Sequence, residues 1–250
     1  MDSTQPSPPA PPPARFRPSE LEQAIVAVIR RGQSSWQPDL YEVCLNERVM
    51  VWKDMSRRPW IFRRIFGAVL RREARALQAL GGFPGAPRLL GLAGRDGFVM
   101  ERLEGQRLPH LKDNDLPPAF FDALLRALRA MHAAGVAHGD LRRKNVLVEP
   151  GAPPRPRLID FGTAIVLGPR PGPIRKALWR RARRIDLLHY AKLKEHYLPG
   201  SLTPEEKRWL AYAPWFYRLG RLYRARIHRP LKWRNLRKTL RAWGLLGPKR

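Results

Sequence analysis

The sequence predicts an α+β chain of two lobes, a small β-rich N-lobe over residues 19–104 and a helical C-lobe over residues 105–250. Residues 41–46 and 48–53 read as two short apolar strands, which is typical of a β-hairpin. Residues 117–134 carry apolar side chains at helical spacing. Strands early in the chain and helices later therefore predict two lobes of different composition.

Length and charge set the outer bounds of function. The chain has 250 residues, of which 44% are hydrophobic, enough for a packed core. Its net charge is +27 and its isoelectric point about 11.5, so it attracts polyanions such as nucleic acid, an anionic membrane or a phosphate-rich glycolipid. Cys44 is the single cysteine, which excludes an internal disulfide and favours a reducing compartment.

The N-terminal residues 1–18 are rich in proline and predict a disordered tail. This start lacks the basic and then apolar stretch of a signal peptide. No apolar run in the sequence approaches the ~18 residues of a transmembrane helix. We therefore expect a cytoplasmic protein.

The N-lobe is expected to combine helices with the hairpin. Ser19 suits a helix start, and apolar residues follow at helical period, namely Leu21, Ala24, Ile25 and Val28. The hairpin is expected to turn at Asn46 and Glu47, and residues 70–80 predict a helix that lies against the sheet.

The C-lobe pattern adds a second hairpin and further helices. Residues 146–148 and 157–159 read as short buried strands around a turn at 151–154, and Thr203 suits a helix cap with Pro204 in the first turn. A last helix is predicted with an apolar face made of Trp233, Leu236, Leu240 and Trp243. Its remaining basic surface suits docking onto an anionic membrane; the alternative is packing against the lobe.

The densest chemical pattern lies between His138 and Gly162. It begins with His138-Gly139-Asp140-Leu141-Arg142-Arg143-Lys144-Asn145 and continues with Asp160-Phe161-Gly162. The first run fits H-R-D-L-x-x-x-N at every fixed position except the Arg, and the second is D-F-G. Each pattern alone recurs by chance, but their order beside two predicted strands is specific. Here the chain resembles the protein-kinase-like superfamily, which implies a two-lobed protein-kinase-like fold.

The resemblance implies phosphoryl transfer from ATP with Mg²⁺. In this chemistry the protein positions the reactants and neutralises charge on the transferring group. Asp140 would accept or orient the proton of the acceptor hydroxyl, and Arg142 would place positive charge near the γ-phosphate. Asn145 and Asp160 would hold Mg²⁺ through their side-chain oxygens.

The same resemblance assigns the nucleotide contacts of the N-lobe. Lys53 ends the second hairpin strand, like the Lys of V-A-I-K, and Glu73 in the predicted helix is its expected ion-pair partner. The alternative is that Lys53 is an ordinary surface lysine. Residues 97–105 resemble the strand and linker that join kinase lobes, so backbone groups of Glu101 and Leu103 are expected to read the adenine edge.

Two departures from the family pattern qualify the prediction. Gly32 is the single glycine between Ala24 and Lys53, so there is no Gly-rich loop; the backbone amides of that turn, or the nearby Arg30 and Arg31, could contact phosphate instead. Gly139 replaces the Arg of H-R-D and no A-P-E follows, so control by activation-loop phosphorylation is not expected. Residues 138–145 correspond to the catalytic loop of kinases. Asp186 is expected either to brace this catalytic loop or to be a surface charge.

Within the superfamily, the chain resembles small bacterial lipopolysaccharide core kinases that phosphorylate Kdo or heptose, and more distantly RIO-type kinases. This implies transfer of the γ-phosphate to a lipopolysaccharide core sugar by a protein held peripherally on the inner membrane. Residues 60–66 mix aromatics with arginines and suit either membrane contact or packing. The alternatives are a RIO-like protein serine/threonine kinase, and a catalytically weak kinase fold that binds membrane or RNA through its basic surface.

Overall fold

The computed structural model describes residues 13–34, 36–110 and 116–211. The described residues up to Trp209 form one compact unit. The predicted basic helix with Trp233 and Trp243 lies outside the described residues. Every helix in the described ranges is too short or too polar to span a bilayer.

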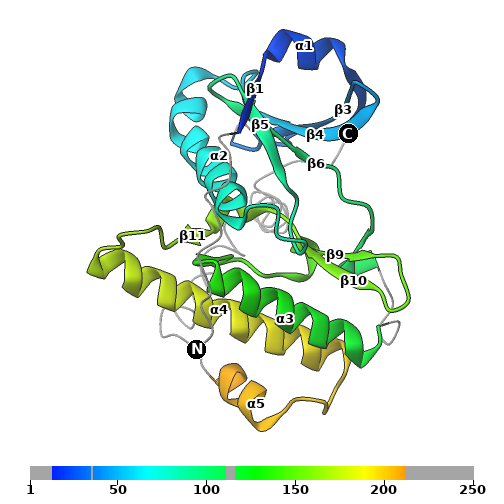
Figure 1. Ribbon diagram of the computed structural model, residues 1–250, viewed down its shortest axis with the longest axis vertical. Helices are drawn as coiled ribbons and strands as arrows, with labels where there is room; N and C mark the ends of the chain where they lie inside the picture. The colour runs from blue at the N-terminus through cyan, green and yellow to red at the C-terminus, as the bar shows by residue number, and fades with distance from the viewer. Residues whose placement is uncertain (1–12, 35, 111–115, 212–250) are drawn as a thin grey trace, which may run out of the picture. The chain divides into compact units, whose positions relative to one another are not determined.

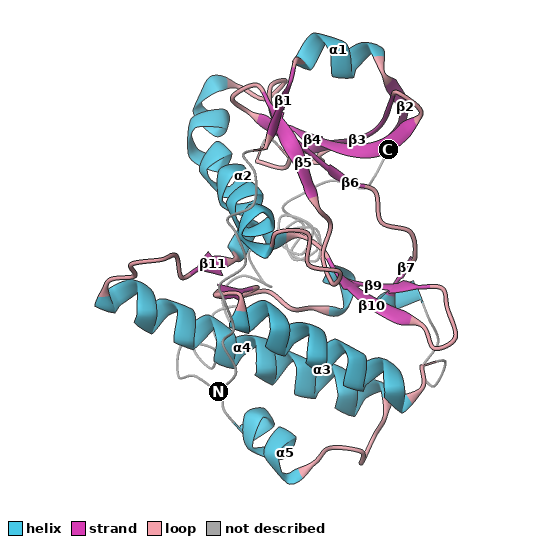
Figure 2. Cartoon of the chain, in the orientation of Figure 1, coloured by secondary structure: helices cyan, strands magenta, loops and turns pink. Residues whose placement is uncertain are grey.

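A six-stranded sheet forms the N-lobe, in the order β1-β5-β6-β4-β3-β2 (Figure 1). Neighbouring strands are antiparallel except β1, which runs parallel to β5. The strands are β1 (Ala14–Phe16), β2 (Ile25–Arg30), β3 (Asp39–Leu45), β4 (Arg48–Asp54), β5 (Leu89–Ala93) and β6 (Gly97–Glu101). Helix α1 (Pro18–Gln23) connects β1 to β2, and helix α2 (Trp60–Leu80) lies beside the sheet (Figure 2).

The predicted first hairpin is confirmed as β3 and β4. Asn46 and Glu47 form its two-residue turn with φ values of 50° and 63°. Positive φ at both turn residues matches the right-handed twist of the paired strands, so the register is fixed locally. As a result Lys53 lies opposite Leu40, near the end of β4.

Two N-lobe predictions differ from the structure. Residues 14–16 were predicted to be part of a disordered tail, but they form β1, whose backbone pairs with the edge of β5. The predicted helix from Ser19 to Val28 is wrong beyond Gln23, because residues 25–30 form β2. The run Ile25-Val26-Ala27-Val28-Ile29 is mostly β-branched, and pairing with β3 outweighs the helical spacing of its apolar residues.

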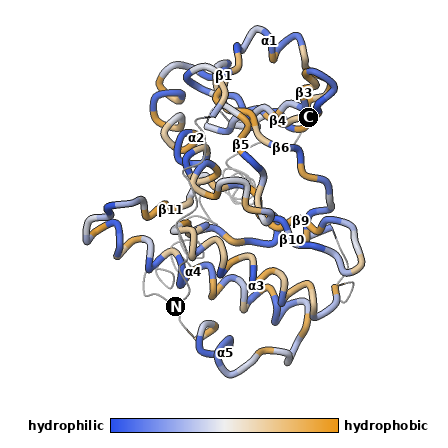
Figure 3. Tube along the Cα trace, in the orientation of Figure 1, coloured by the Kyte–Doolittle hydropathy of each residue, from blue (hydrophilic) through white to orange (hydrophobic). Residues whose placement is uncertain are grey.

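Helix α2 contains the predicted helix 70–80 but begins ten residues earlier, at Trp60. No proline interrupts this stretch, and Gly81 ends it in the left-handed conformation with φ 57°. Hydrophobic and hydrophilic positions alternate along the helix (Figure 3). The buried face comprises Gly67, Leu70, Glu73, Ala74, Ala76, Leu77 and Leu80.

The C-lobe is built from helices below two small sheets. The helices are α3 (Pro118–Ala133), α4 (Pro173–Tyr197) and α5 (Pro204–Ala211). The strands are β7 (Gln106–Arg107), β8 (Val136–Ala137), β9 (Val146–Glu149), β10 (Arg155–Leu158) and β11 (Ile165–Val166). One sheet has the order β10-β9-β7 and the other pairs β11 with β8. Helices α3 and α4 lie side by side beneath β9 and β10 (Figure 1).

Three C-lobe predictions are confirmed. The predicted helix 117–134 is α3, and Gly135 follows it with φ 75°. The predicted second hairpin is β9 paired with β10. At the start of α5 the Glu206 amide donates to Thr203 Oγ1 at 3.3 Å while the Thr203 amide donates to the Glu206 carboxylate at 2.8 Å, a reciprocal cap.

One hydrophobic core runs through both lobes. It contains Leu77 from α2, Phe98 from β6, Phe121 from α3 and Phe161 from the D-F-G run, all 1% exposed or less. A smaller cluster around Trp52 fills the space between the sheet and α1. The shared core fixes the sheet, α2 and the catalytic loop around one another, so residues from distant parts of the sequence can meet in one site.

Candidate active site

A cavity of about 330 Å³ lies between the N-lobe sheet and the catalytic-loop region of the C-lobe. Among its lining residues are six that the sequence singled out, namely Lys53, Glu73, Glu101, Leu103, Asn145 and Asp160. Asp140 and Arg142 are absent from the lining. The structure therefore brings the predicted nucleotide and metal residues together and leaves the predicted proton acceptor beside them.

Lys53 on β4 and Glu73 on α2 form a buried ion pair. Lys53 Nζ lies 2.6 Å from Glu73 Oε2, and both side chains are less than a tenth exposed. Burial raises the pKa of the Glu73 carboxyl, while the Lys53 ammonium opposes this and the charge of Asp160 adds to it. Lys53 is therefore no ordinary surface lysine; its ammonium is held inside the cavity by α2.

Asp160 faces the same cavity from the D-F-G run. Its carboxylate Oδ1 lies 3.8 Å from Lys53 Nζ, and its side chain is 50% exposed. Burial pushes the pKa of Asp160 upward, but the electrostatic effect of the nearby cations Lys53, Lys144 and Arg30, with that of His138, outweighs burial and holds the pKa below its ordinary value. The group is therefore an anion that is available to a cation or a positively charged donor.

The backbone of Asp160 is in the left-handed region, with φ 68° and ψ 68°. This conformation is uncommon for a residue other than glycine, and the packing of the next residue maintains it. Phe161 is fully buried, and its ring lies 4.7 Å from the ring of His138. Anchoring Phe161 in the core turns the preceding carboxylate toward the cavity.

Asn145 connects the cavity to Asp140. Its amide nitrogen donates to the Asp140 backbone carbonyl at 2.9 Å and lies 3.4 Å from the Asp140 carboxylate. With its nitrogen used in this way, the side-chain oxygen of Asn145 is left to serve as an acceptor or ligand. Arg142 Nε donates to the Asp140 carboxylate and restricts its orientation.

Asp186 braces the catalytic loop, which was one of its two expected roles. This α4 residue is fully buried and accepts hydrogen bonds from the His138 and Gly139 amides, both at 2.8 Å. It also lies 3.0 Å from His132 Nε2. Because Gly139 has φ 76° and a Cβ there would lie 2.9 Å from the Thr163 carbonyl oxygen, the position of the H-R-D arginine is restricted to glycine in this chain.

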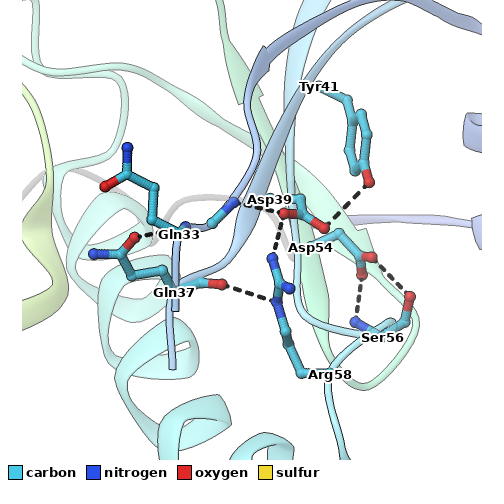
Figure 4. Close-up of polar contacts among 8 residues, drawn as sticks. Gln33, Gln37, Asp39, Tyr41, Asp54, Ser56 and Arg58 are labelled. Carbon is cyan, nitrogen blue, oxygen red and sulfur yellow. Dashed lines mark hydrogen bonds and ion pairs between the residues drawn. The ribbon is translucent and has the colours of Figure 1, made fainter. Parts of the chain in front are cut away.

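The turn between β2 and β3 occupies the place where a kinase has its Gly-rich loop. Its amides are used within the protein: Gly32 donates to Asp39 Oδ1 at 2.7 Å and Gln33 donates to Gln37 Oε1 at 3.1 Å. Figure 4 shows Asp39 between Tyr41 and Arg58, and Arg58 also donates to the Gln37 carbonyl at 3.1 Å. The Gly32 and Gln33 amides are therefore occupied in this structure, whereas Arg30, the other kind of group that the sequence offered for phosphate, lines the cavity.

The part of the cavity away from the charged residues suits a flat apolar group. Glu101 and Leu103 line it from the segment that joins the lobes. Apolar side chains cover its walls from both lobes, namely Val51, Met100, Leu147 and Ile159. A cavity that is apolar in one part and charged in the other suits a nucleotide, whose base is flat and apolar and whose phosphates are charged.

Comparisons with known proteins agree with this geometry. The sequence model of the RIO domain matches residues 47–170. The matched segment is just under half of the chain and is similar to the RIO domain. This confirms the prediction of a protein-kinase-like fold with RIO-type relatives.

Two solved structures have the same fold. The Rio2 kinase from Chaetomium thermophilum superimposes with a TM-score of 0.56 and 15% sequence identity over 76% of this chain and 64% of that one. Its ADP/Mg²⁺–phosphoaspartate complex gives a TM-score of 0.53 and 18% identity over 76% and 63%. The chain thus spans less than two thirds of the length of these relatives. No curated protein shows significant sequence similarity to it.

The oxygen ligands that line the cavity fit Mg²⁺. In the described ranges no three His, Cys, Asp or Glu side chains cluster as a preformed metal cage. Asp160 and Asn145 instead offer one ionised carboxylate and one amide oxygen to the cavity. Mg²⁺ commonly takes one or two protein oxygens and completes its shell with phosphate and water, so these two residues are sufficient.

The structure also identifies residues that the sequence did not single out. Lys144 lies within the catalytic-loop motif at a variable position, and its side chain lines the cavity. The Asp39–Arg58 pair that fastens the β2–β3 turn joins residues distant in the sequence. Lys144 could have been identified from the sequence, because it is a cation that stands between two motif residues. No sequence pattern indicates the Asp39–Arg58 pair.

Proposed function

We propose that this chain is an ATP- and Mg²⁺-dependent kinase that transfers the γ-phosphate to a hydroxyl group. The observation that carries the proposal is the convergence of Lys53, Glu73 and Asp160 on a cavity whose other end is apolar and lined by Glu101 and Leu103. A structure of the same fold, the Rio2 kinase complex, contains ADP and Mg²⁺. The RIO domain match supports the same reaction class.

In this proposal each residue has one task. Lys53, held by Glu73, donates to the α- and β-phosphates, while Asp160 and Asn145 supply oxygens to Mg²⁺. Bound Mg²⁺ supplies charge neutralisation on the phosphates. The acceptor oxygen bonds to the γ-phosphorus as its bond to the β–γ bridging oxygen breaks, ADP leaves, and Asp140 takes the hydroxyl proton. Arg142 orients Asp140 until the acceptor binds.

The test compares two aspartate variants of the full chain. We expect ADP release from ATP with Mg²⁺, its loss on chelation of Mg²⁺, and a fall of about 10³-fold in Asp140→Asn. Asp122→Asn is the matched control, because Asp122 is exposed on α3 away from the cavity. Equal activity in Asp140→Asn and Asp122→Asn, or no Mg²⁺-dependent turnover at all, would overturn the proposal in favour of a non-catalytic basic binding module.

The acceptor is proposed to be a hydroxyl on a macromolecule. The sequence favoured a lipopolysaccharide core sugar, with a protein serine or threonine as the alternative, and the RIO domain match favours the protein. Label from γ-labelled ATP should then appear in protein. Label that appears in extracted core glycolipid instead would return the assignment to the sugar.

A second candidate acceptor is the enzyme itself. The Rio2 kinase complex holds phosphoaspartate together with ADP and Mg²⁺. In this chain Asp160 is ionised and half-exposed to the cavity, so its carboxylate oxygen could displace ADP from the γ-phosphate and form an acyl phosphate. Hydroxylamine releases label from an acyl phosphate but not from phosphoserine, and label that resists it would exclude this route.

Peripheral attachment to an anionic membrane is a separate proposal about partners. Trp60, Ile61 and Ile65 on α2 are 68%, 47% and 58% exposed, and the single acidic residue of α2, Glu73, is buried. Exposed apolar residues among arginines suit the interface of an anionic bilayer. The double variant Ile61→Glu/Ile65→Glu should lose co-sedimentation with phosphatidylserine vesicles. The control Val26→Glu, at a position 63% exposed on β2, should retain it.

The same assay addresses nucleic acid as the alternative polyanion. An RNA-binding surface would give affinity that falls steeply with salt and is insensitive to the apolar α2 substitutions. Retained vesicle binding in the double variant would reject the α2 face as the attachment site.

A further inference from the structure

The described residues of the β2–β3 turn are not among the cavity lining, and two of their amides are already used within the protein. The Gly32 amide donates to Asp39 and the Gln33 amide donates to the Gln37 side chain. Arg58 closes the turn from behind through its contacts with Asp39 and the Gln37 carbonyl. A turn fastened by three side chains in this way cannot present the Gly32 and Gln33 amides to a triphosphate without losing those bonds, so side chains that already line the cavity are better placed to bind the phosphates.

Two cationic side chains are in position to do so. Arg30 ends β2 in the N-lobe and Lys144 lies in the catalytic loop of the C-lobe, and both line the same cavity. Within the described ranges neither side chain makes a hydrogen bond or ion pair, whereas the side chain of the lining cation Arg102 is paired with Glu42 at 2.6 Å. These two cations come from different lobes and have no anionic partner in the described part of the chain, so the cavity carries positive charge that no paired carboxylate neutralises.

Both charges act on the metal end of the cavity. Lys144 and Arg30 are among the groups whose positive charge lowers the pKa of Asp160. The excess positive charge is therefore concentrated beside Asp160, where the proposed function puts the β- and γ-phosphates.

We propose that Arg30 and Lys144 form a two-sided clamp that binds the nucleotide phosphates in place of a Gly-rich loop. The inference rests on the proposed function, since it assigns phosphate binding within that same site. Arg30 can hold a phosphate with two parallel N–H donors, while Lys144 supplies a flexible point charge. Together with Lys53 they surround the triphosphate with positive charge from the sheet and from the catalytic loop.

The test measures dissociation constants for ATP, ADP and adenosine in the presence of Mg²⁺ by titration calorimetry. Arg30→Ala and Lys144→Ala should each weaken ATP binding by about tenfold and leave adenosine binding within about twofold. The loss for ADP should be smaller than for ATP, because one phosphate is missing. Both side chains are exposed, so the thermal midpoint should stay unchanged in either variant.

Matched controls lie one residue away. Arg31 follows Arg30 and Arg143 precedes Lys144, and neither lines the cavity. Arg31→Ala and Arg143→Ala remove the same charge from the same segments, so they should keep ATP affinity within about twofold at moderate salt. An equal loss of ATP affinity in Arg31→Ala and Arg30→Ala would reduce the effect to general electrostatic attraction and overturn the clamp.

The outcomes separate the clamp from the kinase proposal. A wild-type chain that binds no ATP contradicts the proposed function itself. A wild-type chain that binds ATP and transfers its phosphate, while Arg30→Ala and Lys144→Ala bind ATP equally well, contradicts the clamp alone. Loss of adenosine affinity as large as the loss of ATP affinity would show that the substitutions disturb the cavity and not the phosphate contacts.

Discussion

Two buried lysine–glutamate pairs, one in each lobe, differ in how fully the carboxylate is hydrogen-bonded. In the cavity, Lys53 reaches one oxygen of Glu73 at 2.6 Å and lies 3.8 Å from Asp160. In the C-lobe, Lys194 reaches both oxygens of Glu206 at 2.9 Å. The Tyr190 hydroxyl at 3.1 Å and the Thr203 amide at 2.8 Å complete the Glu206 shell.

The pKa values move in opposite directions. Burial raises the pKa of Glu73, and the nearby charge of Asp160 adds to this. Burial also acts against ionisation of Glu206, but the bonds from Lys194, Thr203 and Tyr190 outweigh it and lower the pKa. In the Lys194–Glu206 pair every carboxylate oxygen is hydrogen-bonded, and the pair joins two helices. In the Lys53–Glu73 pair the carboxylate has fewer donors and a second carboxylate lies nearby, so the lysine remains available for a ligand.

The largest expected effect comes from Lys53→Met. Removing the cavity ammonium should lower phosphoryl transfer by about 10³-fold, because it removes a charge that the transition state needs. Glu73 would then protonate more readily, since its pKa is already raised and the opposing ammonium is gone. The folded variant would keep a proton that the unfolded chain loses, so its stability relative to wild type should fall as pH rises.

Steady-state ADP release and urea unfolding at several pH values check both parts. Activity within tenfold of wild type would contradict the role of Lys53. A stability difference that is independent of pH would contradict the raised pKa of Glu73.

Lys194→Met should mainly affect stability. It leaves the Glu206 carboxylate buried without its counter-ion, which costs about 3 kcal/mol of unfolding free energy. ATP affinity of the folded fraction should stay at the wild-type value, because this pair lies outside the cavity lining. Urea unfolding together with ATP titration checks this prediction. The control is Lys207→Met, because Lys207 is exposed and follows Glu206 on α5.

The pH dependence of the Glu206 contribution sharpens the comparison. Because its pKa in the folded state is lowered from 4.5, the carboxylate contributes stability that is fully present above pH 4.5 and is lost as pH falls through the folded-state value. Glu206→Gln should cost about 2 kcal/mol at neutral pH and progressively less in acid. Unfolding free energies of both proteins across this range give the difference. A difference that grows toward acid would contradict the assignment.

The smallest effect is expected for Thr203→Ala. The Thr203 hydroxyl accepts one amide hydrogen bond at the start of α5, and its loss should cost about 1 kcal/mol. The Thr203 backbone amide still donates to Glu206, so the Lys194–Glu206 pair should persist. Thr203→Ser, which keeps the hydroxyl, should restore most of the stability in the same urea experiment.

Sequence reasoning succeeded where one segment carries its own signal. The Asn46–Glu47 turn, the Thr203 cap and the order of the 138–145 and 160–162 motifs are local patterns, and the structure contains each of them. It failed at residues 14–16 and 25–30, where pairing with a distant strand decided between helix, coil and strand. Local propensity is weak compared with such tertiary contacts.

The amino-acid sequence by itself predicted the kind of chemistry, because residues typical of phosphoryl transfer stand in a fixed order beside short strands. The tertiary structure alone decided how the cavity is built around Asp160. The bonds of Gly32 and Arg58 to Asp39, and the opening of Arg30 and Lys144 onto one cavity, depend on segments that are far apart in the chain. Contacts of that kind form only when the whole core packs, so no local pattern reports them.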